Sequence, residues 1–362
     1  MVTIHARRPL LLPADITPSR PDMQVVGIFN PGAIDCGDHT LILARVSEAP
    51  IERRDGWHPA PRWRSDGSGL ELDWLPATEW STQDSRSLEH RDSGFVRLTF
   101  TSHLRAIRHP LDLQRQAVTP PQHPLLPQGE LEIYGIEDPR ITRVDNDCLL
   151  SYVCVSPAAA CTALARTRDG TVLDRLGVCF PPENKDVVLF PERIAGRLAA
   201  LHRPNPRYRF RAPEIWIGFS PDGVHWGDHR PLRWPRGASD AAWCAGKTGA
   251  GCVPVRTAAG WLVIYHGNAR PPADASSETG AYVAAALLLD LEDPTRVIAT
   301  TPEPLIAPTT AFERDGFLPD VIFPTALLDR GTRWAVVYGA ADTSIGVLEI
   351  DKSDLEAALV RA

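Results

Sequence analysis

Short apolar stretches separated by tight polar turns run along most of the chain. Five times, an apolar stretch with a proline is followed by a turn and then by a strand that ends in polar or aromatic residues. Most of the turns hold Gly, Asp or Asn, which tight turns favour. Proline is tolerated at a strand's start or at a bulge, where its missing N–H costs no ladder hydrogen bond. The five predicted hairpins cover residues 26–45, 139–155, 191–203, 254–266 and 324–339.

A unit that recurs at this scale is typical of a repeat architecture. Strand-rich units without amphipathic helices between them favour radial repetition of β-sheets. We therefore predict an all-β chain that forms a five-bladed β-propeller, with one hairpin at the inner edge of each blade. Outer strands are expected between the hairpins, for example at residues 95–100 and 214–219. A β-sandwich is the alternative, but it would not require the same unit each time.

Three segments fall outside the repeat, within a single predicted domain over residues 1–362. Residues 1–20 are expected to form an extended N-terminal arm. Residues 50–92 are polar yet hold four tryptophans, which is too aromatic for a disordered linker, so we predict a Trp-rich insertion folded over one face. The tail has a Ser-x-x-Glu capping box at Ser353 and Glu356, which predicts a short C-terminal helix over residues 355–360. The four tryptophans are Trp57, Trp63, Trp74 and Trp80.

Composition narrows the classes of function. The net charge of −7 and the lack of a basic stripe argue against nucleic acid as a partner. No apolar run approaches the roughly 18 to 20 residues of a membrane span, and no long apolar segment follows the first arginines as in a secretory signal. The seven cysteines are scattered without a CxxC pair, which predicts unpaired thiols in a cytoplasmic protein and no metal site. Whether the chain forms a homo-oligomer is left open.

Charged residues stand where the pattern predicts the start of a buried strand. Residues 137–140 read Glu-Asp-Pro-Arg, and charges on a buried strand need partners or a task. A salt bridge between Asp138 and Arg140 is the structural alternative. A propeller would gather the polar strand ends around a central channel. These residues are Asn30, Arg45, Glu137, Asp138, Arg140, His202, Arg203, His266 and Asp342, with Lys185, Asp186 and Lys247 at short offsets from the repeats.

One acid among several cations suits chemistry on a neutral polyol with an anionic co-substrate. An Asp can donate a proton to a leaving oxygen, and Arg and Lys can hold a phosphate. Lys247 lies in a Gly-rich turn, but the spacing of its Gly-Lys-Thr is not that of a nucleotide P-loop. A nucleotide site is therefore not expected.

Taken together, these motifs resemble glycoside hydrolase family 130, which contains β-mannoside phosphorylases and related β-mannosidases. The resemblance extends over residues 26–350, interrupted by the Trp-rich insertion. The matching stretches are residues 29–34, 44–46, 102–105, 137–141, 184–192, 201–204, 220–226, 247–251, 265–267, 316–324 and 338–342.

The resemblance implies a fold and a set of roles. It implies a five-bladed β-propeller and an inverting phosphorolysis of a β-mannoside, a mannosyl oligosaccharide or a mannosyl-glucose, that yields α-mannose 1-phosphate. Asp138 would be the acid and would act through a hydroxyl of the bound mannosyl unit. Asn30, Arg45, His266 and Asp342 would bind the sugar, and Lys185, Arg203 and Lys247 would bind phosphate. Inorganic phosphate would be a co-substrate, with no other cofactor.

Two other functions stay open. An inverting β-mannosidase on the same scaffold would need a carboxylate as base, and Glu183 is close enough in sequence to supply it. A sugar-binding propeller without chemistry is disfavoured, because it has no use for an acid beside a cation cluster. The tryptophans of the insertion are expected to be better sugar platforms than Trp243, Trp261 and Trp334, which suit core packing.

Overall fold

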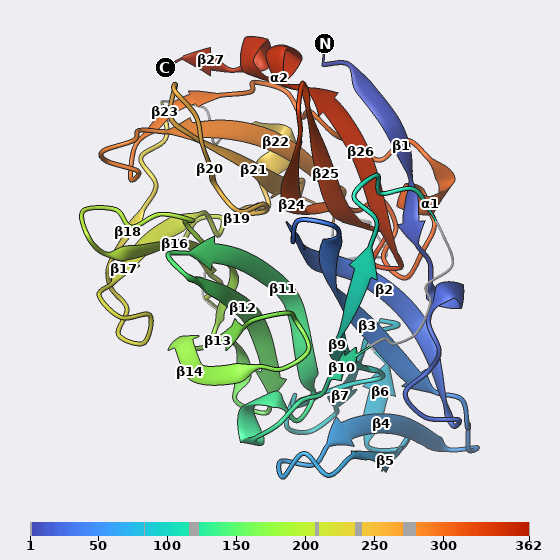
Figure 1. Cartoon of the computed structure of the whole chain (residues 1–362). Coiled ribbons are helices and arrows are strands. Elements are labelled where there is room, and N and C mark those ends of the chain that lie inside the picture. Colours follow the sequence, from blue (N-terminus) through green and yellow to red (C-terminus); the bar gives the residue numbers. More distant parts are fainter. Residues whose placement is uncertain are drawn as a thin grey trace.

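A computed structural model describes residues 2–82, 84–115, 123–206, 210–235, 241–270 and 280–361 (Figure 1). The described chain is built almost wholly of β-strands. The helical elements among the described residues are short: α1 (Ala311–Arg314), α2 (Lys352–Ala358) and the 3₁₀ turns η1 (Pro13–Asp15), η2 (Glu130–Glu132) and η3 (Ala242–Cys244).

Most strands fall into five antiparallel groups that follow one another along the chain. The first group is β2 (Met23–Asp35), β3 (Thr40–Pro50), β9 (Thr101–His109) and β10 (His123–Leu125); the second is β11 (Gly135–Val144), β12 (Asp147–Ser156), β13 (Ala159–Thr167) and β14 (Asp174–Phe180). The third is β15 (Asn184–Leu189), β16 (Leu198–Pro204), β17 (Trp216–Ser220) and β18 (Gly227–Pro231). The fourth is β19 (Lys247–Ala250), β20 (Val255–Arg256), β21 (Trp261–Asn268), β22 (Tyr282–Leu289), β23 (Val297–Thr300) and β27 (Val360–Arg361); the fifth is β24 (Ile322–Arg330), β25 (Arg333–Ala340), β26 (Ser344–Asp351) and β1 (Ile4–Leu11).

The five predicted hairpins are all present. They are β2–β3, β11–β12, β15–β16, β19 and β20 with β21, and β24–β25. Their second strands lie in separate sheets, except that one parallel pair, Gly135 with Ser102, joins the first two groups. Strands β2, β11, β19 and β24 lie toward the middle of the molecule, and β14, β18, β23 and β1 lie at its edge (Figure 1).

Each of five apolar cores lies between two groups. The cores join the first group to the second, the second to the third, the third to the fourth and the fourth to the fifth. The remaining core packs Ile28 and Val46 of the first group against Val337 and Val347 of the fifth. Burial of apolar surface between the sheets therefore links the five groups in a closed cycle.

The two ends of the chain depart from prediction. The expected N-terminal arm is extended, but it is a sheet strand: β1 pairs with β26, with Ile4 opposite Ile350. The C-terminal helix is present but begins earlier than predicted, at Lys352 after the N-cap Asp351. The predicted cap, Ser353, lies inside the helix, so the Ser-x-x-Glu pattern does not mark its start.

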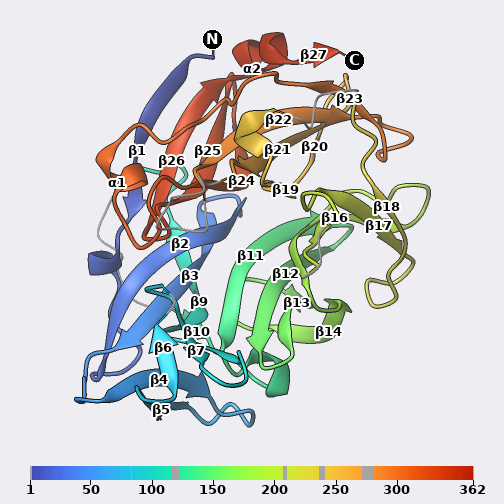
Figure 2. The same ribbon diagram turned by 180° about the vertical axis from the view of Figure 1, so that it is seen from behind.

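Residues 51–100, between the paired strands β3 and β9, hold the Trp-rich insertion. They form two small sheets, which lie at the end of the molecule remote from both termini (Figure 2). Trp63 is buried and donates a hydrogen bond to Thr101 Oγ1 at 2.8 Å, which ties this segment to β9. The predicted outer strand at residues 95–100 is wrong, because β8 pairs with β7 instead. The two sheets are β4 (Trp57–Trp63) with β5 (Leu70–Pro76), and β6 (Trp80–Thr82) with β7 (Ser87–His90) and β8 (Val96–Leu98).

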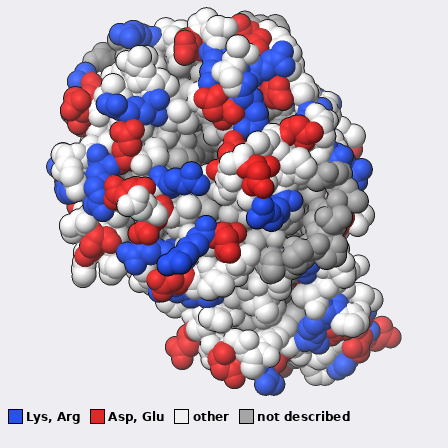
Figure 3. Space-filling view, in the orientation of Figure 1, with Lys and Arg blue, Asp and Glu red and all other residues white. Residues whose placement is uncertain are grey.

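All seven cysteines lie in the described part of the chain and are free thiols, five of them buried. No helix among the described residues is long and apolar enough to cross a membrane. Basic and acidic side chains are interspersed over the face that Figure 3 shows.

Candidate active site

Three polar residues occupy the same place in the first strands of three groups. Asn30, Asp138 and Asp186 have backbone φ angles of 45°, 49° and 56°, in the left-handed region that Asn and Asp tolerate best among non-glycine residues. Each lies where the strand slips in register against its hairpin partner. A bulge of this kind bends a strand and redirects a side chain. All three residues line one cavity.

The cavity has a volume of about 810 Å³ and draws residues from all five groups and from the insertion. It brings together seven of the eight residues predicted for the site: Asn30, Arg45, Asp138, Lys185, Arg203, Lys247 and Asp342.

Asp138 is held on one side by a fixed set of donors. Its Oδ1 accepts hydrogen bonds from Asn30 Nδ2 and Arg45 Nη1, each at 2.9 Å. Arg45 also binds Glu137 Oε1 at 2.8 Å and Ser102 Oγ at 3.1 Å, and its guanidinium packs over Phe29. Burial alone would raise the pKa of Asp138, but the charges of Arg45 and Arg140 outweigh it and lower that pKa below its ordinary value.

Arg140, two residues after Asp138, is almost fully buried. It donates to the carbonyls of Gly251 at 2.7 Å and of Asp138 and Pro139 at 3.2 Å. The salt bridge from Arg140 to the Asp138 carboxylate, considered from sequence, is thus replaced by bonds to backbone oxygens. Arg140 thus holds the backbone of the bulge in place, and its positive charge helps to lower the pKa of Asp138.

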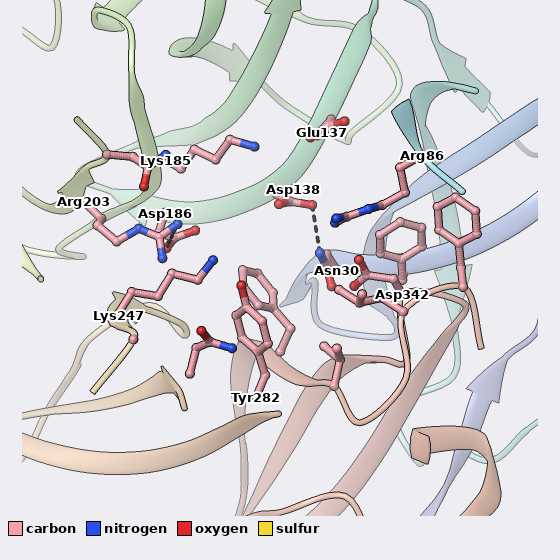
Figure 4. A pocket seen from close by; sticks show the side chains of 18 of the residues that line it. Asn30, Arg86, Glu137, Asp138, Lys185, Asp186, Arg203, Lys247, Tyr282 and Asp342 are labelled. Carbon is pink, nitrogen blue, oxygen red and sulfur yellow. Dashed lines mark hydrogen bonds and ion pairs between the residues drawn. The ribbon is translucent and has the colours of Figure 1, made fainter. Parts of the chain in front are cut away.

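A cluster of cations lies on one side of Asp138, at a distance from Asn30 and Asp342 (Figure 4). Arg203 is buried and pairs with Asp186 through Nη2 at 3.1 Å. No described residue accepts a hydrogen bond from its Nε or Nη1, although both atoms are buried. Lys247 lies 5.0 Å from the ring centre of Tyr282, and Lys185 lines the same part of the cavity. Buried guanidinium N–H groups without an acceptor are costly, and an anion would satisfy them.

Asp342 stands on the other side of Asp138, beside Asn30 (Figure 4). Its position in the β25–β26 turn requires a φ of 46°. Burial, together with the negative charge of Asp138, raises the pKa of Asp342 to about 6 against the opposing effect of Arg45. The site thus holds two carboxyl groups whose pKa values are pushed in opposite directions.

His266 lies behind the cavity wall. Its ring is fully buried, and Nε2 is 3.3 Å from Asp186 Oδ2. Burial lowers the pKa of His266, although Asp186 acts in the opposite direction. The side chain therefore touches Asp186 and does not line the cavity, which favours a positioning role over the sugar contact expected from sequence.

Comparison with known proteins identifies the family of this chain. Residues 101–358 match the family model of beta-1,4-mannooligosaccharide phosphorylase, glycoside hydrolase family 130. Over 359 residues the chain is 34% identical to the beta-1,2-mannobiose phosphorylase of Listeria innocua serovar 6a, with 97% of this chain and 96% of that protein covered. The chain belongs to glycoside hydrolase family 130. It is also 35% identical over 232 residues to a 1,2-beta-oligomannan phosphorylase of Thermoanaerobacter sp., which covers 63% of this chain and 72% of that one.

A solved structure supports the same family membership. The Listeria innocua beta-1,2-mannobiose phosphorylase, solved with beta-1,2-mannobiose, superposes with a TM-score of 0.87 at 33% identity and covers 98% of each chain. In this family 130 chain, no group of three or more His, Cys, Asp or Glu side chains among the described residues is placed to hold a metal ion.

Several cavity residues of this family 130 member were given no role from sequence. Asp186 was expected among the polar residues around the channel, and its bulge matches those of Asn30 and Asp138, although it lacks the proline that follows them. Arg86 gave no signal, because it reaches the cavity from the insertion. The aromatic wall was also mispredicted: all ten tryptophans are described, and none lines the cavity. Its aromatic residues are Phe29, Phe100, Phe210, Tyr282, Phe317 and Phe323.

Close packing against Gly339 fixes Asn30 in the site of this family 130 protein. A Cβ at Gly339 would collide with the side-chain oxygen of Asn30 and come within 2.9 Å of its backbone nitrogen. We expect Gly339→Ala to lower kcat/KM at least tenfold and to reduce the free energy of unfolding by about 1–3 kcal/mol. Gly227→Ala is the matched control, because no described atom lies within 4 Å of the added Cβ. Equal activity of the two variants would contradict the role given to Asn30.

Proposed function

We propose that the protein catalyses the inverting phosphorolysis of a β-mannoside and releases α-mannose 1-phosphate. The observation that carries the proposal is the buried guanidinium of Arg203 in the cavity wall, whose Nε and Nη1 have no acceptor among the described residues while Nη2 pairs with Asp186. Inorganic phosphate can supply an acceptor, because charge-assisted hydrogen bonds from a guanidinium to phosphate are strong. Lys185 and Lys247 would add the charge that a buried dianion requires.

The scaffold that we propose is a five-bladed β-propeller formed by a single domain over residues 1–362, with residues 50–92 as a surface insertion. Support comes from the closed cycle of apolar cores between successive strand groups. Strand β1 would complete the last blade from the start of the chain, since it pairs with β26. Unpaired thiols suit a reducing compartment, which supports a cytoplasmic location.

Each side chain takes a role in the displacement. Asp138 would donate a proton, through a hydroxyl of the mannosyl unit, to the glycosidic oxygen as the bond from that oxygen to the anomeric carbon breaks. Phosphate, held by Arg203, Lys247 and Lys185, would form the new bond from the opposite face. Asn30, Arg45 and Asp342 would hold the mannosyl unit. His266 would act on phosphate indirectly, by orienting Asp186 and hence Arg203.

The lowered pKa of Asp138 has a consequence for the order of events. An acid must be protonated to act, yet Arg45 and Arg140 favour the ionised form of Asp138 in the empty site. Bound phosphate would bring negative charge near this carboxyl group, and bound sugar would exclude water from it. Both effects raise the pKa of a carboxyl group. Substrate binding would thus prepare the acid.

Hydrolysis is the second candidate, and the position of Glu183 weighs against it. Glu183 is exposed, is bound by Asn205 at 2.9 Å, and does not contribute to the cavity wall. Asp186, the carboxylate nearest the cations, is engaged by Arg203 and His266. The charge of Arg203 overcomes the effect of burial and lowers the pKa of Asp186, so it is a weak base for activating water.

The linkage that we propose is β-1,2, because that linkage is in the names of the relatives with the most extensive matches. The test is a panel of β-1,2-mannobiose, β-1,4-mannobiose and mannosyl-β-1,4-glucose, each incubated with phosphate while mannose 1-phosphate is measured. We expect the highest kcat/KM with β-1,2-mannobiose. A higher value with a β-1,4 substrate would overturn the linkage, and no mannose 1-phosphate from any of the three would overturn the function.

The two carboxyl groups also predict a pH dependence. Burial and the negative charge of Asp138 raise the pKa of Asp342 to about 6, so Asp342 carries a proton in the free enzyme only below about pH 6. We expect kcat/KM for the mannoside to fall as pH rises through this value, since the pKa of Asp138 is lowered and both carboxyl groups are then ionised. In Asp342→Asn the fall should begin at lower pH, because the neighbouring negative charge that raises carboxyl pKa values is gone. Phosphate titrates alike in both variants, so identical profiles would contradict the assignment.

A further inference from the structure

The Trp-rich insertion sends one cationic side chain into the cavity. Arg86, in the loop between β6 and β7, lines the cavity wall together with Asp84 and Ser87. The reaction assigned above leaves Arg86 without a role. Its guanidinium points toward the space between Asp138 and Asp342 (Figure 4).

The loop holds Arg86 in a defined orientation. Asp84 Oδ2 accepts hydrogen bonds from Arg86 Nε at 3.1 Å and Nη2 at 2.7 Å. The other oxygen of Asp84 accepts from the backbone N–H groups of Arg86 at 2.7 Å and Ser87 at 3.1 Å. Thr99 closes the loop by donating its N–H to the carbonyl of Arg86 at 3.0 Å. The side chain of Arg86 keeps 34% of its surface exposed. Asp84 Oδ2 binds Nε and Nη2, so Nη1 lies on the side of the guanidinium away from Asp84.

The geometry of inversion shows which part of the substrate passes Arg86. In an inverting displacement the nucleophile and the leaving group lie on opposite faces of the sugar ring. Lys185, Arg203 and Lys247 stand on one side of Asp138, and Arg86 stands on the other (Figure 4). With the mannosyl unit held between them, the leaving sugar would extend away from the cations, past Asp138 and Asp342 toward the insertion.

The wall on that side suits a neutral sugar. Leu98, Phe100 and Phe317 line it, and the rings of Phe100 and Phe317 pack edge to face with centres 5.5 Å apart. Asp84 balances the charge of Arg86, so the site offers hydrogen-bond donors more than net charge. Apolar and aromatic surface with a few fixed donors is typical of sites that bind small molecules.

We propose that Arg86 is a specificity-determining residue that donates hydrogen bonds to hydroxyl groups of the leaving sugar, and that the Asp84–Arg86 loop forms the acceptor side of the site. The proposal rests on the proposed function and extends it to the choice of acceptor. The insertion would then be part of the substrate site rather than a separate surface module.

The test uses the synthetic direction, in which α-mannose 1-phosphate and mannose release phosphate. We expect Arg86→Ala to raise KM for mannose roughly ten- to a hundredfold, as for loss of a hydrogen bond from a charged donor. KM for α-mannose 1-phosphate should change by less than about threefold, and Arg86→Lys should fall between. Arg54→Ala is the matched control. Arg54 lies in the same insertion and, like Arg86, binds an acidic residue two positions earlier in the chain, here Glu52. Arg54 does not line the cavity.

A series of monodeoxy mannoses then identifies the contact. The deoxy sugar that lacks the hydroxyl group bound by Arg86 should have about the same raised KM with the wild type as mannose has with Arg86→Ala. When this deoxy sugar is combined with Arg86→Ala, KM should rise no further, because the same contact is removed twice. An unchanged KM for mannose, an equal rise in KM for α-mannose 1-phosphate, or fully additive losses would overturn the inference. Thermal melting of each variant shows whether it is folded. If the wild type releases no phosphate with any sugar, both the proposed function and this inference are wrong. If the wild type is active and Arg86→Ala has the same KM for mannose, only this inference is wrong.

Discussion

Asp138→Asn is expected to lower kcat for phosphorolysis by about 10²- to 10⁴-fold, the usual contribution of a general acid. The amide keeps an oxygen that can accept from Asn30 and Arg45, as Oδ1 of Asp138 does at 2.9 Å. It cannot deliver a proton. The loss should appear in kcat at saturating mannoside and phosphate, with little change in mannoside binding.

A control in the same hairpin separates loss of the acid from loss of charge. Asp147, at the exposed β11–β12 turn, pairs with Arg166 at 3.2 Å and is remote from the cavity. Asp147→Asn should keep wild-type kcat. An Asp138→Asn enzyme that is folded by circular dichroism and keeps more than a tenth of wild-type kcat would show that another group protonates the leaving oxygen.

Arg203→Ala is expected to raise KM for phosphate about 30-fold or more. Removing one partner of a buried, charge-assisted contact commonly costs 2–5 kcal/mol, and each 1.4 kcal/mol is a factor of ten. Two buried donors are lost, and Asp186 keeps only the ring of His266 as a side-chain partner of its carboxylate within 4 Å in the described structure. KM for the mannoside should change by less than about threefold, because the sugar residues lie on the other side of Asp138.

Two further variants sharpen this prediction. Arg203→Lys should be intermediate, since a lysine supplies charge without the two-pronged geometry. Arg197→Ala, at the exposed start of the same hairpin strand, should leave both KM values unchanged. Equal loss of affinity for phosphate and for mannoside in Arg203→Ala would argue that the residue supports the whole cavity and does not bind the anion.

The parts of the fold that the sequence predicted are those built from local signals. Each hairpin joins strands that are adjacent in the chain, and its turn and proline are visible within about 20 residues. The pairing of β1 with β26 is not local, because Ile4 and Ile350 meet across nearly the whole chain. Nothing in residues 1–20 alone distinguishes a free arm from such a strand. The helix start at Lys352 was missed because the N-cap, Asp351, makes no side-chain capping bond.

The candidate site also combines residues with a local sequence signal and residues that only the tertiary fold brings together. Asn30 and Asp138 precede prolines at strand bulges, so the sequence carries their local signal. Asp186 uses the same bulge without a proline, and its contacts with Arg203 and His266 come from separate strands. Arg86 enters through the tertiary placement of the insertion, which its own residues do not encode. Local signals and the family resemblance therefore pointed to Asp138 and to the cations that line the cavity, but not to Arg86 or to the aromatic residues of the wall.

Phosphate, and not water, is the nucleophile in the proposed reaction. The most direct test is the wild-type enzyme with β-1,2-mannobiose, with and without inorganic phosphate, followed by phosphorus and proton NMR. We expect one α-mannose 1-phosphate for each bond broken and almost no cleavage when phosphate is left out. Free mannose released at the same rate with and without phosphate would contradict phosphorolysis and assign the cavity to hydrolysis.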